Sequence, residues 1–274
     1  SVWIGGEFSN VNGSPRQKLA RILSTNGQLH STTYNCNGNV SSLVVDNYYY
    51  SIYPSFYVGG SFTTISGVAR SYLALIEFES TVSSVLPGAG PNGPIHAMAL
   101  DYSSSSSPRG LMIAGSFTNV SGSYRAGLAR VRVSPYSSPS LDPYFNVWVN
   151  GAVRSFGFQF SSSFQPPTAM LIGGDFTLVD GISRNRIARF KLTYTSSSES
   201  AVQAELDPLY ATGGGSNGIV HAITVAPLET GKIYAGGAFT MMSGSSRNGF
   251  GRLYGANGTA LPAVPSSVEA QFIC

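Results

Sequence analysis

Short apolar runs, separated by turns rich in Gly, Ser and Asn, recur along the whole chain. Two examples are VSSLVV at 40–45 and YLALIEF at 72–78. Apolar runs of this length, bounded by turn residues, are typical of half-buried or buried β-strands. The pattern therefore predicts many short strands rather than amphipathic helices.

A five-fold repeat organises these runs. The motif GGEF at 5–8 recurs as GGSF at 59–62, AGSF at 114–117, GGDF at 173–176 and GGAF at 236–239. A Gly follows each Phe by five residues and an Arg by eight, and an apolar-small-Arg triplet such as LAR comes next, with Leu75 replacing the Arg in the second copy. The motif Phe residues are Phe8, Phe62, Phe117, Phe176 and Phe239, and the Arg residues are Arg16, Arg70, Arg125, Arg184 and Arg247.

A second unit precedes the last four of these motifs. It reads NGNVSSLVV at 37, NGPIHAMAL at 92, NGAVRSFGF at 150 and NGIVHAITV at 217. Each begins with a turn dipeptide and continues as a buried strand. One repeat then holds this inner strand, the strand that ends in GGxF, the LAR strand and a short outer strand near sequences such as LDPYF. Four strands in each copy of the repeat predict a β-propeller blade.

The two ends of the chain complement each other. The first copy lacks the inner strand, whereas the last residues, 268–274, align with 40–46. Pairing the C-terminal strand with the N-terminal segment would close the ring and remove its exposed edges. We therefore predict an all-β fold: one domain over 1–274, a closed five-bladed propeller of four-stranded blades. Blade one is split between 1–36 and 266–274.

These motifs carry a family resemblance. The GGxFT, SG, R and LAR elements resemble the delta-sixty-type repeat propellers of large bacterial surface proteins, and the extracellular repeats of fungal cortical-marker (bud-site) proteins. The resemblance covers essentially the whole chain. It implies a propeller in a secreted or surface-anchored protein, usually without known enzymatic activity, and it implies no ligand.

The recurring motif residues are expected to serve the scaffold, because a residue needed in every blade serves the blade. The Phe should fill the gap between blades, the turn Gly should adopt positive φ, and the Arg should bind loop carbonyls. The functional alternative is five identical pockets for an anion or a glycan.

Residues that differ between copies at one shared position are better candidates for a site. The second position of the inner strand is polar in all five copies. If the inner strands line the central channel, these side chains form one ring that could bind an anion, a metal or a small polar ligand, with His221 and Glu269 as the closest pair. The alternative is a water-filled channel mouth. The ring residues are Ser41, His96, Arg154, His221 and Glu269.

Composition narrows the function classes. The net charge is only +3, which argues against a nucleic-acid partner, and no apolar run is long enough to span a membrane. Low Lys content with abundant Ser and Tyr favours an extracellular or cell-surface location. Asn12, Asn39, Asn119 and Asn257 lie in sequons and are candidate glycosylation sites, although so many sequons are expected by chance.

No catalytic constellation stands out. A glycoside hydrolase would need two carboxylates facing each other, and the 13 acids show no such pair. We expect no enzyme activity, no cofactor and no bound metal. The leading prediction is a structural or adhesive module that contacts other proteins or copies of itself through its variable loops; the alternative is a carbohydrate-binding, lectin-like propeller. Contact-loop candidates are Tyr48, Tyr49, Tyr50 and Tyr53.

The chain has two cysteines, Cys36 and Cys274. The alignment places them near opposite ends of adjacent inner strands, roughly 20 Å apart, which is beyond the reach of a disulfide. We predict no bridge between them.

Overall fold

The computed structural model describes residues 1–46, 55–77, 81–101, 109–134, 137–161, 166–194, 201–211, 214–226 and 231–262. Every regular element in these ranges is a β-strand. The all-β prediction is therefore confirmed for the described part of the chain.

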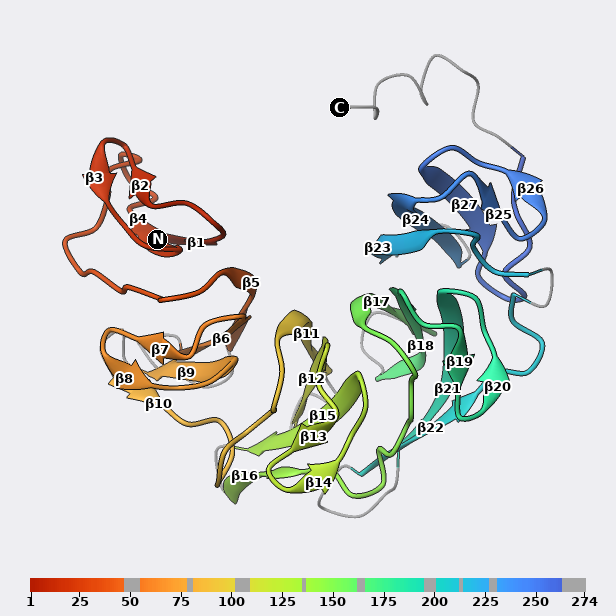
Figure 1. Ribbon diagram of the computed structural model, residues 1–274, viewed down its shortest axis with the longest axis horizontal. Coiled ribbons are helices and arrows are strands. Elements are labelled where there is room, and N and C mark those ends of the chain that lie inside the picture. The colour runs from red at the N-terminus through yellow and green to blue at the C-terminus, as the bar shows by residue number, and fades with distance from the viewer. Residues whose placement is uncertain are drawn as a thin grey trace.

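Five main sheets, numbered one to five in chain order, lie along an arc, with β5, β11, β17 and β23 nearest its centre (Figure 1). Each is an antiparallel meander, and sheets two to four have the predicted four strands. Their strands are as follows: sheet one has β1 (Val2–Gly5) and β4 (Leu19–Ile22); sheet two has β5 (Val40–Asp46), β6 (Ser55–Gly60), β9 (Leu73–Glu77) and β10 (Thr81–Ser83); sheet three has β11 (Ile95–Asp101), β12 (Arg109–Gly115), β15 (Leu128–Ser134) and β16 (Ser137–Leu141); sheet four has β17 (Val153–Phe160), β18 (Pro167–Gly174), β21 (Ile187–Tyr194) and β22 (Val202–Leu206); sheet five has β23 (Ile219–Val225), β24 (Lys232–Ala238) and β27 (Phe250–Tyr254).

A two-residue β-hairpin follows every GGxF motif. In each, a non-glycine residue with φ between 46° and 50° precedes the predicted turn Gly, whose φ lies between 75° and 85°. Two successive positive φ values are those of a type I′ turn. Glycine, at the second of these positions, adopts a positive φ without steric cost. The hairpins are β2 (Asn10–Val11) with β3 (Ser14–Pro15), β7 (Thr64–Ile65) with β8 (Val68–Ala69), β13 (Asn119–Val120) with β14 (Ser123–Tyr124), β19 (Leu178–Val179) with β20 (Ile182–Ser183), and β25 (Met241–Met242) with β26 (Ser245–Ser246).

An asparagine side chain ties each of four hairpins to the inner strand. Asn150 Oδ1 accepts hydrogen bonds from the backbone N–H groups of Thr177 and Leu178, at 2.8 and 2.9 Å. Its Nδ2 donates to Thr177 Oγ1 at 2.9 Å. The Asn of the NG dipeptide is thus a clamp rather than a simple turn residue, and Asn37, Asn92 and Asn217 make the same three bonds.

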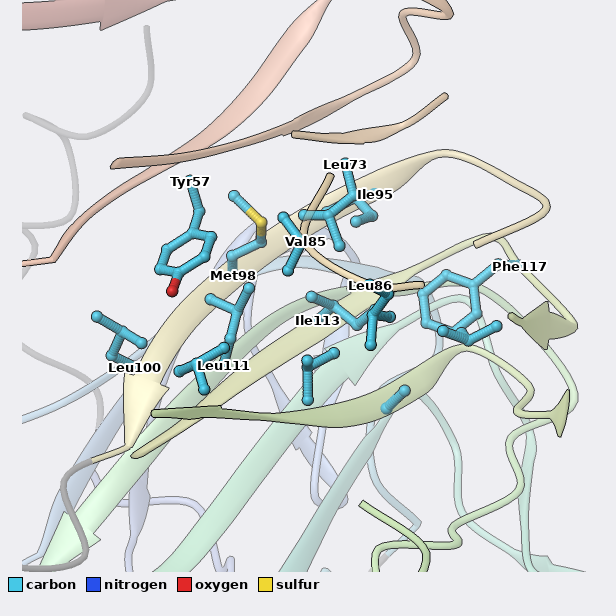
Figure 2. Packing of buried hydrophobic residues seen from close by; sticks show 14 residues of the cluster. Tyr57, Leu73, Val85, Leu86, Ile95, Met98, Leu100, Leu111, Ile113 and Phe117 are labelled. Atoms are coloured by element: carbon cyan, nitrogen blue, oxygen red, sulfur yellow. The ribbon is translucent and has the colours of Figure 1, made fainter. Parts of the chain in front are cut away.

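The core lies between neighbouring sheets. Figure 2 shows one such cluster, in which Tyr57 and Leu73 from sheet two meet Ile95, Leu111 and other residues of sheet three. The motif Phe residues Phe62, Phe117, Phe176 and Phe239 are buried, and Phe8 of the two-stranded sheet one is half-buried.

The first Gly of the GGxF motif permits this close packing. A Cβ at Gly173 would lie 2.6 Å from Val220 Cγ1 of sheet five, and one at Gly59 would lie 2.8 Å from Ile95 Cγ2 of sheet three. Since real Cβ atoms do not approach that closely, the inner strand of the next sheet requires glycine at these two positions, whereas the third copy has Ala114 there.

The recurring Arg binds backbone carbonyls. Arg125 donates to the carbonyl of Tyr124 at 2.7 Å and to that of Asp142 at 3.4 Å, and so joins the hairpin to the residue after the outer strand β16. Arg16, Arg70, Arg184 and Arg247 likewise each bind two or more carbonyls, one of them that of the preceding residue.

Candidate functional site

The ring positions of the inner strands lie on β-bulges. In β5, β11, β17 and β23 the register of pairing shifts at one residue near the start of the strand, and that residue is the predicted ring residue. A bulge leaves one residue unpaired and changes the direction of its side chain. The four bulge residues are Ser41, His96, Arg154 and His221; Glu269 lies outside the described residues.

Arg154 makes the strongest contact of this group. Its Nε donates to Asp175 Oδ1 at 2.5 Å and its terminal nitrogen to Oδ2 at 2.8 Å. Asp175 is the third residue of the GGDF motif and directly follows β18, the neighbouring strand of the same sheet. This hydrogen bonding lowers the pKa of Asp175, so the pair is ionised near neutral pH.

His96 and His221 flank this pair. His96 Nε2 lies 2.7 Å from Ser116 Oγ, and burial followed by the positive charge of Arg154 lowers the pKa of His96. His221 is exposed, and both imidazoles lie within electrostatic reach of Asp175. Sheets three, four and five therefore contribute to one polar group around Asp175.

The third residue of each GGxF motif lies close to the bulge residues. The third residue of GGxF is Glu7, Ser61, Ser116, Asp175 or Ala238. Ser116 and Asp175 contact the bulge residue of their own sheet, and Glu7 Oε1 accepts a hydrogen bond from Asn39 Nδ2 of sheet two at 2.7 Å. Sequence reasoning missed this set, although variation at one place inside an otherwise uniform motif was a signal for it.

The chemistry available to this polar group is limited. The bidentate contact between Arg154 and Asp175 neutralises both charges. Among the described residues, no three His, Cys, Asp or Glu side chains are placed to hold a metal ion. Glu269, the predicted neighbour of His221, lies outside the described residues. The same holds for the predicted contact-loop residues Tyr48, Tyr49, Tyr50 and Tyr53.

A buried ion cluster uses three further charged residues. Arg130 is fully buried; its Nε lies 2.7 Å from Asp101 Oδ2 and its terminal nitrogen 2.6 Å from Asp142 Oδ2. Asp142 Oδ2 also accepts the N–H of Val202 at 3.2 Å, which links sheet three to sheet four. Sheet four repeats part of the cluster, because Arg189 binds Asp207 at 2.5 Å and Gln159 at 2.7 Å.

The Arg130 cluster and the Arg189 contact together contain the carboxylates that are buried in the described part of the chain. Asp101, Asp142 and Asp207 are the acids that lie buried there, and each binds an Arg. A glycosidase needs one carboxyl group free to donate a proton and a second free to act as base or nucleophile. These three aspartates instead hold strands together.

Cys36 and Trp3 occupy structural positions. Cys36 is a free, buried thiol, and burial raises its pKa to about 12. Trp3 packs on Phe56, with ring centroids 4.1 Å apart. Of the four sequon asparagines, Asn12 and Asn257 are exposed, whereas Asn39 and Asn119 are half-buried. Within the described ranges, no helix has the length and apolar character needed to cross a bilayer.

Two segments of the chain, residues 2–32 and 170–192, match a family described as "Domain of unknown function (DUF5122) beta-propeller". The segments include the GGEF and GGDF motifs with their recurring Arg residues. No curated protein and no solved structure matches the chain. The family match supports a propeller repeat family, in agreement with sheets arranged along an arc around their inner strands.

Proposed function

We propose that the chain forms a closed five-bladed propeller in which residues 268–274 supply the missing inner strand of sheet one. Among the described residues, β1 pairs only with β4, whereas β6, β12 and β18 each pair on both sides. The C-terminal residues have the sequence pattern of an inner strand and are the segment of this chain that remains to fill the place beside β1.

Two glycines support this closure. The second Gly of GGxF lies against a carbonyl oxygen of its own inner strand, as Gly60 lies against Asn39. Gly6 and Gly236 are the glycines that would flank the proposed strand. Gly6 meets only the ring of Phe8 among the described residues, and Gly236 meets only Gly249 O, at 3.9 Å from its added Cβ. Glycine at both positions is explained if a backbone passes between them.

The proposed function is that of a non-catalytic extracellular module that contacts other proteins or further copies of itself. One observation carries this proposal: the charged residues that recur between repeats bind partners within the fold. Each recurring Arg donates to carbonyls of its own repeat, and each buried aspartate binds an Arg. We therefore assign function to the loops whose sequences differ between repeats, since loops commonly carry binding residues.

A self-association experiment tests this function. The wild-type protein is compared with a variant in which Tyr48, Tyr49, Tyr50 and Tyr53 are replaced by Ser, using sedimentation velocity over a hundredfold range of concentration. Tyrosine rings supply apolar contact area at low entropic cost. We therefore expect the wild type to associate as its concentration rises and the variant to stay monomeric. A matched control replaces exposed Tyr124 and Tyr144, which lie outside this segment.

Other outcomes identify the competing functions. A wild type that stays monomeric and binds immobilised glycans in a screen would make the protein a lectin. Release of reducing sugars from polysaccharides by the wild type would make it a glycosidase. If the wild type and the Tyr variant associate to the same extent, the Tyr loop does not form the contact.

A further inference from the structure

Sheet two holds a pocket of about 220 Å³ that the other features of the repeat do not explain. It lies between the start of β9 and the connection 84–90 that leads to sheet three. Its polar lining consists of Arg70, Ser71 and Ser84, and Leu73, Val85 and Leu86 form its apolar wall.

Small residues open this pocket. Counting back from the clamp asparagines Asn92 and Asn150, the sequence Gly88-Ala89-Gly90 stands where sheet three has Asn146-Val147-Trp148. In sheet three Val147 is buried and Trp148 half-buried. A Cβ at Gly90 would meet no atom within 4 Å. The small residues of the sheet-two connection therefore leave open space beside Arg70, at a place where the next repeat has larger residues in its sequence.

The pocket contains a positive charge without a matching acid. In sheets three and four an aspartate, Asp142 or Asp207, follows the outer strand, and it binds the LAR arginine. In sheet two Leu75 stands at the position of the LAR arginine and pairs with Ser83, so both charges of that pair are missing. None of the described lining residues is acidic. Arg70 is thus the one charged group among them.

Arg70 retains donors for a ligand. It donates to the carbonyl of Ala69 at 2.7 Å and, over a longer distance of 3.4 Å, to that of Val82. A guanidinium has five N–H donors, and these carbonyls use two. The buried Nε has no partner, but the same holds for Arg16, Arg125 and Arg184. The distinguishing features of sheet two are therefore the open space and the missing carboxylate, not this nitrogen.

The apolar wall is held in place by the core. Leu73, Val85 and Leu86 belong to the cluster between sheets two and three, and Figure 2 shows Leu86 between Val85 and Phe117. Val85 and Leu86 are only 2% and 3% exposed. A wall of buried side chains keeps the shape of the pocket fixed, so a ligand need not order it on binding.

We propose that this pocket binds a small carboxylate of about monosaccharide size. The volume corresponds to about seven water molecules at roughly 30 Å³ each. A carboxylate would neutralise Arg70 with charge-assisted hydrogen bonds, and the apolar wall would cover a carbon skeleton. The Ser71 hydroxyl would bind a neighbouring hydroxyl group, and Ser84 Oγ, which donates to the carbonyl of Leu86, would accept a hydrogen bond from another. This site is independent of the proposed loop contact and of ring closure.

Ligand-detected saturation-transfer NMR on the intact protein tests the site. The probes are sodium D-glucuronate and uncharged D-glucose. We expect glucuronate to bind and glucose to bind about tenfold or more weakly, since a hydrogen bond between charged groups accounts for at least that factor. Arg70→Gln should weaken glucuronate binding by a similar factor, and Ala89→Leu should abolish it by filling the pocket.

The matched control is Arg184→Gln. Arg184 is half-buried like Arg70 and likewise binds the carbonyl of the preceding residue and carbonyls near the end of the outer strand, so its loss removes similar bonds without touching the pocket. Thermal melting verifies that each variant is folded, and exposed Ala89 provides a second test should Arg70→Gln not fold. Absence of glucuronate binding to the wild type, equal binding of glucose, or full retention of binding by Ala89→Leu would each overturn the proposal.

Discussion

Arg154 and Asp175 form a bidentate ion pair across two neighbouring strands of sheet four, with N–O distances of 2.5 and 2.8 Å. They lie 21 residues apart in sequence, and the bulge in β17 directs Arg154 towards the GGDF motif. The pair is the centre of the polar group that His96 and His221 complete.

Replacing Asp175 by Asn should lower the free energy of unfolding at pH 7 by about 0.5–1 kcal/mol, a small value because both side chains are about a third exposed, at 32% and 33%. The pKa of Asp175 is lowered in the folded protein. The contribution of Asp175 to the free energy of unfolding is therefore complete above its unfolded pKa of about 3.9. It is lost as the pH falls through the pKa of Asp175 in the folded protein.

Urea denaturation between pH 2 and pH 7 measures this effect. The wild type and Asp175→Asn should differ at pH 7 and converge in acid. Glu205→Gln, at an exposed position of β22, is the control and should change little at any pH. A difference that is constant with pH would show that the ion pair is not its source.

Arg130 should be far more sensitive than Arg154. Substitution by Met would leave Asp101 and Asp142 buried without their cation, and breaking such a cluster typically costs about 3–5 kcal/mol. Burial disfavours the charged guanidinium, but the two aspartates outweigh this and raise its pKa. The midpoint of urea unfolding measures the loss.

Two further variants show whether the loss of stability comes from the buried ion cluster. Arg252→Met removes the equivalent, half-buried Arg of sheet five, which binds the carbonyl of Pro262, and should cost much less. The triple variant Arg130→Met, Asp101→Asn, Asp142→Asn should recover part of the stability, because no charge is left buried. Equal losses for Arg130→Met and Arg252→Met would contradict a special role for the cluster.

The repeat made the strands and turns predictable, because their periodicity, Gly spacing and apolar runs are local signals. The inner strand at 40–46 and the positive φ of Gly67 are examples that the structure confirms. The outer strand was less well placed: LDP lies at its end, since β16 and β22 stop at Leu141 and Leu206.

The contacts of the site could not be predicted in the same way. The approach of Arg154 to Asp175 depends on a bulge: the sequence marks the bulge residue as polar, but the partner that it faces is set by backbone pairing. The cluster of Arg130 depends on three strand ends meeting in space. The pocket beside Arg70 arises from side chains that are missing relative to the neighbouring copy, and this becomes visible only when the two connections lie in equivalent places.

Cys36 should be inert towards thiol reagents in the folded protein. It is 1% exposed, and its raised pKa keeps it protonated, whereas thiol reagents attack the thiolate. In a Cys274→Ser variant, which leaves Cys36 as the single thiol of the chain, a chromogenic disulfide reagent at pH 8 should react only after urea is added. Rapid reaction in buffer would mean that the core around Cys36 opens readily.

Ring closure predicts that Gly6 is as intolerant of a side chain as Gly60. A Cβ at Gly60 would overlap the carbonyl oxygen of Asn39 in the paired inner strand, and overpacking of this kind costs about 1–3 kcal/mol. At Gly6 the nearest described atom is a ring carbon of Phe8, at 3.3 Å, and Phe8 is only half-buried. If residues 268–274 pair with β1, Gly6→Ala should lower the melting temperature about as much as Gly60→Ala. If the place beside β1 is open, Gly6→Ala should be almost neutral, and the five-bladed closure would be wrong.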